Sequence, residues 1–249
     1  MAGNPSRPFV WLNAAMSLDG RLAYAEGRRA LLSGPEDLRR VQDLRRSLDA
    51  ILVGSGTVLA DDPSLRVHWE RVVEDPPLRG AQPTRVVLDS RGRLPAGARV
   101  LDGSLPTLVF TNLTSPGRYP PTVEVVREGT GRMPILRVLA GLWSRGIRSV
   151  LVEGGSVVLS AFLREGYVDR FTLFQAPVLI GEGSSPVLFG EPAASGAATA
   201  LGLRLEGAVP LDAGCLLWGV PTRTQPGAPA PPALEPTGFL PPKGPAPQP

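Results

Sequence analysis

The sequence predicts an α/β fold in which helices flank a mixed, mainly parallel sheet and antiparallel strands lie at the C-terminal end. Short apolar runs alternate with helical patterns over the first 165 residues, which is the order found in βαβ units. One apolar run, Ser149–Val152, leads through a Glu-Gly-Gly turn into a helical pattern that begins at Ser156. Segments 168–176 and 214–220 alternate apolar and polar residues instead, as antiparallel strands do.

The other strands are predicted from short runs of β-branched and aliphatic residues that polar residues or glycines interrupt. These runs lie at 9–15, 50–53, 85–89, 107–111 and 123–126. Polar turns or loops are expected at 16–20, 54–57 and 60–65, and irregular chain at 21–32.

Three helices are predicted between these strands. The first begins at Ser33-Gly34-Pro35-Glu36, where Ser33 is the expected N-cap and the proline lies in the first turn. It runs to about residue 48, and its expected core-facing stripe is Leu38, Val41, Leu44 and Leu48. The other two helices lie at 135–145 and 156–164.

The chain is expected to form one domain over residues 1–220, followed by a disordered tail at 221–249. Eleven of the 29 tail residues are proline, which removes backbone donors, and few apolar residues remain to build a core. A polyproline-II-like tail fits this composition best. Docking of the tail into an aromatic-lined groove is the alternative reading.

Composition excludes several classes of function. The 26 basic and 23 acidic residues leave a net charge of +3 without a polybasic cluster, so no nucleic-acid partner is expected. With only one cysteine and one histidine, no Ser-His-Asp or Cys-His constellation is expected. No metal is expected either, because the chain offers no Cys site, no His-x-x-x-His pattern and no carboxylate cage beside Asp61-Asp62. No signal sequence or membrane-length apolar run is found, which predicts a cytoplasmic protein without a membrane partner.

Polar residues gather where four of the predicted strands end. They form the clusters Asn13–Asp19, Gly54–Thr57, Asp89-Ser90 and Glu153–Ser156. Because the carboxyl ends of parallel strands share one edge of a sheet, these clusters are expected to converge on one cleft. Each cluster alone is equally well read as an ordinary connecting loop.

The Glu-Gly-Gly turn at 153–155 has the properties of an anion site. Glycine tolerates positive φ and lets a ligand approach the backbone, and the free amides of the following helix favour a phosphate. Asp61-Asp62-Pro63 forms another candidate cluster, in which Asp62 is expected to make the turn and Asp61 to contact a ligand. His68, with Arg66 on the same face, could meet a phosphate, although a lone histidine is more often structural.

Taken together, these residues resemble the pyrimidine reductase family of riboflavin biosynthesis, which has a dihydrofolate-reductase-like fold. The resemblance covers about residues 8–220. The matching segments are Asn13–Ala23, Leu44-Arg45, Asp49–His68, Arg85–Ser90, Val152–Gly155, Val168-Asp169 and Ala176–Gly181. Among these, Thr-Val-Leu-Ala-Asp-Asp-Pro at 57–63 combined with Val-Glu-Gly-Gly at 152–155 is the most specific pattern.

The resemblance implies an NADPH-dependent oxidoreductase that reduces a ribosylamino-pyrimidine 5′-phosphate to the ribitylamino compound. The implied cofactor contacts are Ala15, Thr57, Asp61, Ser90, Gly154, Gly155 and Ser156, with the turn continuing to Ser160. The implied substrate contacts are Asn13, Arg45, Leu65, His68 and Glu153. Arg45 and His68 would hold the substrate phosphate, and Asp61 and Glu153 are the candidate catalytic residues that steer protons.

Two departures from the family pattern limit this reading. Bifunctional members carry an arginine in place of His68, and a serine and a tryptophan in place of Arg29 and Leu31. Asn13 and His68 resemble the single-domain type, which acts before deamination, so the diamino and the deaminated base both stay open. By position, Arg91 or Arg93 could contact the adenosine 2′-phosphate.

Two other functions are weighed against this one: a reductase of another pterin or pyrimidine on the same fold, and a non-catalytic nucleotide-binding module. The family resemblance also implies a homodimer.

Overall fold

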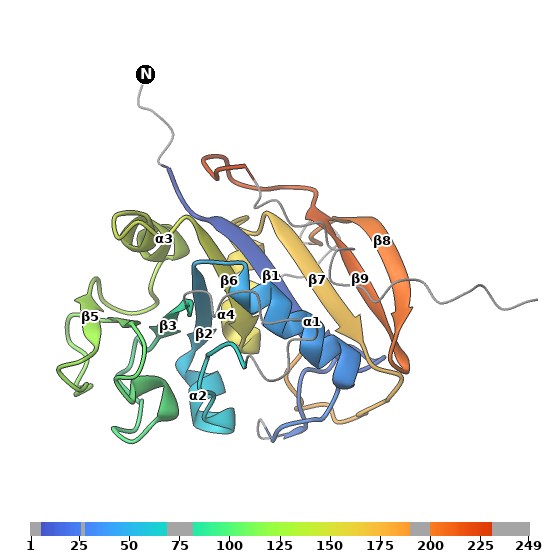
Figure 1. Cartoon of the computed structure of the whole chain (residues 1–249), viewed down its shortest axis with the longest axis horizontal. Helices are drawn as coiled ribbons and strands as arrows, with labels where there is room; N and C mark the ends of the chain where they lie inside the picture. The colour runs from blue at the N-terminus through green and yellow to red at the C-terminus, as the bar shows by residue number, and fades with distance from the viewer. Residues whose placement is uncertain (1–5, 26–27, 69–81, 190–199, 231–249) are drawn as a thin grey trace, which may run out of the picture.

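The computed structural model describes residues 6–25, 28–68, 82–189 and 200–230. In this part of the chain nine strands form one sheet (Figure 1). Their spatial order is β5 (Glu124–Arg127), β4 (Thr107–Thr111), β3 (Thr84–Leu88), β2 (Ala50–Gly54), β6 (Ser149–Gly154), β1 (Phe9–Met16), β7 (Arg170–Gln175), β9 (Gly214–Pro221) and β8 (Leu203–Leu211). Pairing is parallel from β5 to β7 and antiparallel between β7, β9 and β8, which confirms the predicted fold class.

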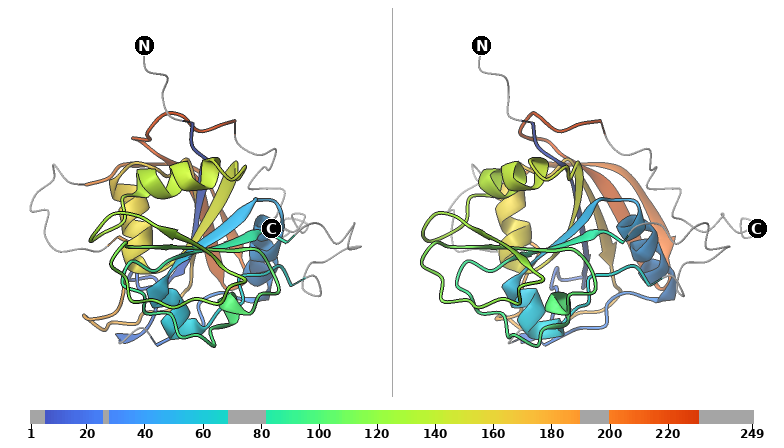
Figure 2. Two further views of the ribbon diagram at one scale, coloured as in Figure 1. Left: turned by 90° about the vertical axis from the view of Figure 1, so that its left-hand side faces the viewer. Right: turned by 60° about the vertical axis from the view of Figure 1, so that its left-hand side comes forward.

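Helices cover both faces of the sheet. The helices α3 (Ile135–Trp143) and α4 (Ser156–Arg164) pack on one face, and α1 (Pro35–Arg46) packs on the other (Figure 2). The largest core lies under α3 and α4, where strand residues such as Val10, Leu52 and Val150 are fully buried. A smaller core under α1 joins Trp11, Leu44 and Leu151. This burial of both sheet faces explains why the central strands are mostly apolar.

Apart from a three-residue 3-10 helix, η3 (Arg99–Leu101), two elements were not predicted. The helix α2 (Ser55–Asp61) follows β2 directly, although Gly54 and Gly56 suggested a turn there. It ends at Asp62, whose positive φ of 40° reverses the chain, so the prediction that Asp62 makes this turn is confirmed. Strand β8 contains a glycine and a proline and is mostly exposed, and both features weaken a strand pattern.

The start of α1 differs from the prediction. Its N-cap is Gly34 rather than Ser33, and Gly34 provides no side-chain cap. Asp212, in the turn between β8 and β9, provides the cap instead: its carboxylate accepts the amides of Glu36 (3.1 Å) and Asp37 (2.9 Å). A distant residue therefore satisfies the free amides of the first turn.

The predicted apolar stripe of α1 is only partly correct, because Leu44 and Leu48 are buried in the core but the other two members are not. Leu38 is 37% exposed, whereas Asp37, Arg40, Gln42 and Leu44 are buried. The helix therefore turns a largely polar face towards the sheet. An apolar period cannot reveal such a face, because charged residues are buried only when distant partners neutralise them.

Replacement of Asp212 by alanine should lower the free energy of unfolding by about 1 kcal/mol, because two amides of α1 lose their acceptor. Urea unfolding measures the effect. Asp43→Ala is the matched control, since Asp43 lies on the same helix in an exposed pair with Arg46 (2.8 Å) and should cost less than about 0.5 kcal/mol. Equal losses in both variants would contradict the capping role.

Residues just after position 220 form hydrogen bonds with the rest of the domain. Thr224 Oγ1 donates to the Val168 carbonyl (3.0 Å), the Gln225 amide to the Gly166 carbonyl (2.7 Å), and the Arg7 amide to the Gly227 carbonyl (3.0 Å). The first residues of the predicted tail thus lie against the domain, and residues 231–249 lie outside the described residues. No described helix has the length and apolarity to cross a membrane.

Candidate active site

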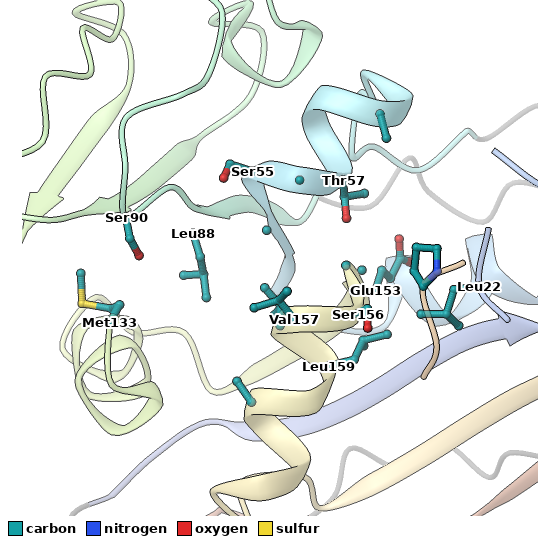
Figure 3. Close-up of a pocket in the computed structure, with 18 of the residues that line it drawn as sticks. Leu22, Ser55, Thr57, Leu88, Ser90, Met133, Glu153, Ser156, Val157 and Leu159 are labelled. Atoms are coloured by element: carbon teal, nitrogen blue, oxygen red, sulfur yellow. The ribbon is translucent and has the colours of Figure 1, made fainter. Parts of the chain in front are cut away.

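A cavity of about 880 Å³ lies along the carboxyl edge of the parallel strands (Figure 3). It extends from Ala14 and Ala15 on β1, past β6 and β2, to Leu88 and Ser90 at the end of β3. The predicted convergence of strand ends is confirmed for β1, β2, β3 and β6. Within the cluster at the end of β3 only Ser90 lines the cavity, because the Asp89 carboxylate is buried and accepts the amides of Arg93 and Leu94.

Two similar strand–turn–helix units form the middle of the cavity wall. Gly54 joins β2 to α2, and Gly154-Gly155 join β6 to α4, so that both helices begin at the cavity. Gly155 has a φ of 82°, and a Cβ on it would lie 3.1 Å from Thr57 Oγ1. A Cβ on Gly154 would lie only 2.9 Å from the same atom. Glycine lets these turns approach each other this closely, and the first turn of α4, which has no side-chain cap, is suited to an anion.

All seven predicted cofactor contacts line this cavity: Ala15, Thr57, Asp61, Ser90, Gly154, Gly155 and Ser156. Thr57 and Ser156 lie on the facing helices α2 and α4 (Figure 3). The hydroxyl of Ser156 donates to the Val187 carbonyl (2.6 Å), which leaves its backbone amide as the group that could meet a ligand.

Glu153 reaches the cavity through a β-bulge. Leu52 pairs with Val152 but Val53 pairs with Gly154, so Glu153 has no partner on β2. Such a bulge re-aims the side chain. The Glu153 carboxylate accepts two hydrogen bonds from Arg45 of α1, from Nε (2.8 Å) and Nη2 (2.6 Å). Burial acts to lower the pKa of Arg45, but the charge and hydrogen bonds of Glu153 outweigh it and raise that pKa.

The predicted substrate contacts occupy less uniform positions. Glu153 lines the cavity, whereas Asn13, Arg45, Leu65 and His68 do not. Arg45 Nη1 donates to the Arg66 carbonyl (3.2 Å), and the His68 amide donates to Gln42 Oε1 of α1 (2.9 Å). The structure thus brings Glu153, Arg45 and the 66–68 segment together beside α1.

Leu65 and Asn13 are largely enclosed by protein. Leu65 is 2% exposed with a φ of 47°, and its side chain packs in a core with Val53, Val58 and Val87. Its side chain is therefore closed to a ligand. Asn13 is 6% exposed, and its Oδ1 accepts hydrogen bonds from Arg40 and Thr172.

Asp61 lies at the end of α2, on the cavity wall. Partial burial raises the pKa of its carboxyl above the ordinary value, and the charge of Arg29 opposes the shift. A carboxyl that keeps its proton to higher pH suits proton donation. Arg29 belongs to the segment where the chain departs from the family pattern.

Several cavity residues were not predicted. They are Leu22, Ala23, Asn112, Arg132, Met133, Ile135 and Pro186. Asn112 directly follows β4, so the rule that predicted Ser90 would also have indicated it. Leu22 and Pro186 come from two loops that show no regular pattern, and tertiary contacts alone bring them to the cavity.

These two loops are tied to each other beside the cavity. The Leu22 amide donates to the Pro186 carbonyl (2.8 Å), and the Asp19 carboxylate accepts the amides of Ile180 (3.1 Å) and Gly181 (2.9 Å). Hydrogen bonds from Ser17 and from these amides hold the pKa of Asp19 well below its usual range. Within the described residues, no group of three His, Cys, Asp or Glu side chains is placed to hold a metal.

Comparisons with known proteins relate this architecture to one family. The family model described as the RibD C-terminal domain matches residues 8–217. A 2,5-diamino-6-ribosylamino-4(3H)-pyrimidinone 5′-phosphate reductase of Methanothermobacter thermautotrophicus is 44% identical over 179 residues, which cover 70% of this chain and 80% of the relative. The protein of the same name from Archaeoglobus fulgidus is 38% identical over 188 residues, with 73% and 86% covered.

A solved structure shows the same fold. RibD of Acinetobacter baumannii superposes with a TM-score of 0.74 at 32% sequence identity, over 87% of this chain. The match covers only 59% of that longer protein, so this chain is similar to one part of it.

Proposed function

The chain belongs to the RibD C-terminal domain family, a family of pyrimidine reductases in riboflavin biosynthesis, and we propose that it reduces 2,5-diamino-6-ribosylamino-4(3H)-pyrimidinone 5′-phosphate with NADPH. The observation that carries this proposal is the continuous cavity. Two glycine turns that suit a dinucleotide line this cavity. It is also lined by two carboxylates, of which Glu153 suits binding of a sugar and Asp61 suits donation of a proton.

A nicotinamide dinucleotide fits the residues present. The close approach of Gly154 and Gly155 to Thr57 leaves no room for a Cβ, while the first amides of α4 stay available for phosphate oxygens. About 880 Å³ is within the usual range for a cofactor site. When bound, the cofactor supplies the hydride, and the protein contributes alignment, exclusion of water and proton transfer.

The substrate is proposed to bind on the α1 side of Glu153. The Glu153 carboxylate, held by Arg45, would accept hydrogen bonds from the sugar hydroxyls. Arg45, Arg66 and His68 lie together there and would face the sugar phosphate. Reduction at the first sugar carbon needs an open-chain imine. It forms when the bond from that carbon to the ring oxygen breaks and the nitrogen lone pair makes the C=N bond, while the ring oxygen gains a proton and the nitrogen loses one. Asp61 is proposed as the group that gives the ring oxygen its proton.

The diamino base is proposed because the relatives with this name are covered over 80% and 86% of their length. The chain spans about half the length of the RibD proteins that it also matches. The reaction in the name of the diamino-pyrimidinone reductases is the reading that fits both facts.

NADPH is proposed over NADH because of the charge at the β3 end of the cavity. Arg91, Arg93 and Arg132 line this end, whereas the two lining carboxylates, Asp61 and Glu153, come from other elements. Arginine suits a phosphate by charge and by geometry. Arg93 Nη2 already donates to Ser55 Oγ (3.1 Å), which orients it along the wall.

Arg91→Ser should raise the KM for NADPH roughly 10-fold, because one charge-assisted hydrogen bond to the 2′-phosphate is lost. The KM for NADH should not change. Steady-state kinetics with both cofactors measure the ratio. Arg118→Ser, an exposed arginine outside the cavity, is the control, and a parallel change for both cofactors in Arg91→Ser would contradict the assignment.

Proton donation by Asp61 predicts the direction of the pH dependence. The carboxyl must be protonated to donate, so kcat/KM should fall as the pH rises through the raised pKa of Asp61. Asp61→Asn should abolish this limb and lower kcat roughly 100-fold. A pH profile measured for both proteins tests this, and an unchanged limb in Asp61→Asn would assign the proton to another group.

The proposed function is tested by anaerobic NADPH oxidation with freshly prepared diamino and amino-dione substrates side by side. The protein is expected to turn over the diamino compound faster than the amino-dione compound. Faster turnover of the amino-dione compound would overturn the assignment of the diamino base. If neither compound were turned over while NADPH still bound, the protein would be a reductase of another substrate. The cytoplasmic location and the homodimer stay predictions, and sedimentation equilibrium decides the dimer.

A further inference from the structure

A buried ion pair lies under α1 and takes no part in the reaction proposed above. Arg40 and Asp37 are 2% and 1% exposed. Arg40 Nε donates to Asp37 Oδ1 (2.8 Å), and Arg40 Nη2 lies 2.7 Å from the same oxygen in the ion pair. Taking two charges out of water costs free energy that their attraction offsets only in part. Replacing them by apolar residues is often neutral for stability, so this pair calls for a role other than stability.

The ion pair acts on Asn13. Arg40 Nη2 donates to Asn13 Oδ1 (2.9 Å), and Thr172 Oγ1 on β7 donates to the same oxygen (2.8 Å). Trp11 Nε1 donates in turn to Thr172 Oγ1 (3.3 Å). Two chains of hydrogen bonds, here called arms, therefore end on the Asn13 amide oxygen. One arm comes from Arg40 on α1, and the other runs through Trp11 and Thr172 within the sheet.

The donors in these arms decide which way the Asn13 amide points. A guanidinium has only N–H donors, and so does an indole nitrogen. Thr172 accepts from Trp11 and has one proton left, which it gives to Asn13. If the amide were reversed, its NH2 group would face the NH2 groups of Arg40. Oδ1 must therefore face the arms, and Nδ2 must face away from them.

Asn13 itself is not a lining residue of the cavity, but it lies next to residues that are. Asn13 and Ala15 lie two residues apart on the same face of β1, and Ala15 lines the cavity. This part of the cleft also adjoins Arg45 and Glu153, where the substrate is proposed to bind.

We propose that Arg40, held by Asp37, is a positioning residue that fixes Asn13 as a hydrogen-bond donor towards a carbonyl oxygen of the pyrimidine. This inference rests on the proposed function. The diamino substrate has its carbonyl at C4, and the deaminated compound has carbonyls at C2 and C4. A donor that suits both bases selects the C4 oxygen. An aspartate at position 13 would present only acceptors there.

Three variants test the inference in the full-length protein. Asn13→Asp keeps the oxygen that Arg40 and Thr172 contact but loses the outward N–H group. Arg40→Lys still donates to Asn13 and pairs with Asp37. The double variant Asp37→Leu/Arg40→Met removes the charges together, so no buried charge is left unpaired. For each, KM and kcat are measured with both pyrimidine phosphates, and the Kd for NADPH serves as the check on the fold.

Asn13→Asp and the double variant should raise the pyrimidine KM about 10-fold, with a smaller change in kcat, as expected for a lost binding contact. The increase in KM should be equal for the two pyrimidines, and the Kd for NADPH should not change. Arg40→Lys should keep the KM close to the wild-type value. A wild-type KM in the double variant would overturn the role of Arg40. A loss confined to the dione would overturn the assignment to C4.

Failure of the proposed function is read separately. If the wild-type protein reduces neither pyrimidine, the function fails, and the orientation of Asn13 is measured without substrate. The side-chain NH2 signals of Asn13, identified by their loss in Asn13→Asp, should exchange readily with solvent in the free protein and become protected in the double variant, where the amide is free to turn. Protected signals in the wild-type protein would overturn the orientation.

Discussion

Glu153→Gln should lower kcat/KM roughly 100-fold, because the charge that accepts two Arg45 hydrogen bonds and faces the substrate is lost. Glutamine keeps one acceptor oxygen of the same shape, and the side chain borders an open cavity, so Arg45 can recruit water. The free energy of unfolding should fall by only about 1–2 kcal/mol. Steady-state kinetics and urea unfolding measure the two effects.

Glu124→Gln is the matched control for this substitution. Glu124 also pairs with an arginine, Arg145, at 2.7 Å, but this pair is exposed and lies outside the cavity. We expect its activity to equal that of the wild type, and its stability to fall by less than about 0.5 kcal/mol. Unchanged turnover in Glu153→Gln would remove this carboxylate from the active site.

Gly155→Ala should weaken NADPH binding by about 3 kcal/mol, which corresponds to roughly 100-fold in Kd. The φ of 82° and ψ of 118° at this position are strained for any residue with a Cβ, and the new methyl group would lie 3.1 Å from Thr57 Oγ1. Relief of this crowding moves the α2 and α4 turns apart and tilts the first amides of α4. Fluorescence titration with NADPH measures the change.

Gly166→Ala separates the backbone strain from the effect on binding. Gly166 has a φ of 74° but lies outside the cavity, and a Cβ there would have its nearest neighbour at 3.6 Å. This variant should lose about 1–2 kcal/mol of stability and bind NADPH like the wild type. If both variants bound NADPH equally well, the turn at Gly155 would not be a phosphate site.

The sequence predicted the strands and helices best where burial imposes a regular period. The central strands β1, β2, β3, β4 and β6 were predicted within one or two residues because both faces of the sheet are covered, which makes most of their residues apolar. The prediction failed at α2, where glycines required by the neighbouring turn hid a helix, and at β8, an exposed edge strand.

The candidate cofactor residues were predictable for a topological reason. Parallel strands place their carboxyl ends at one edge, so residues as far apart as Thr57, Ser90 and Gly155 meet at one cavity once the strands are known. The family resemblance added which of these residues to choose. Neither argument could indicate Leu22 or Pro186, which reach the cavity through loop–loop hydrogen bonds.

By itself the sequence determined the fold class, the family and the cavity edge, because these depend on local periods, glycine turns and strand direction. Only the tertiary structure decided how the polar side chains pair. Asp212 caps a helix 176 residues before it, Arg45 holds Glu153 across 108 residues, and Arg40 orients Asn13 from 27 residues away. Such hydrogen bonds depend on distance and direction in space, and no periodic pattern in the chain records them.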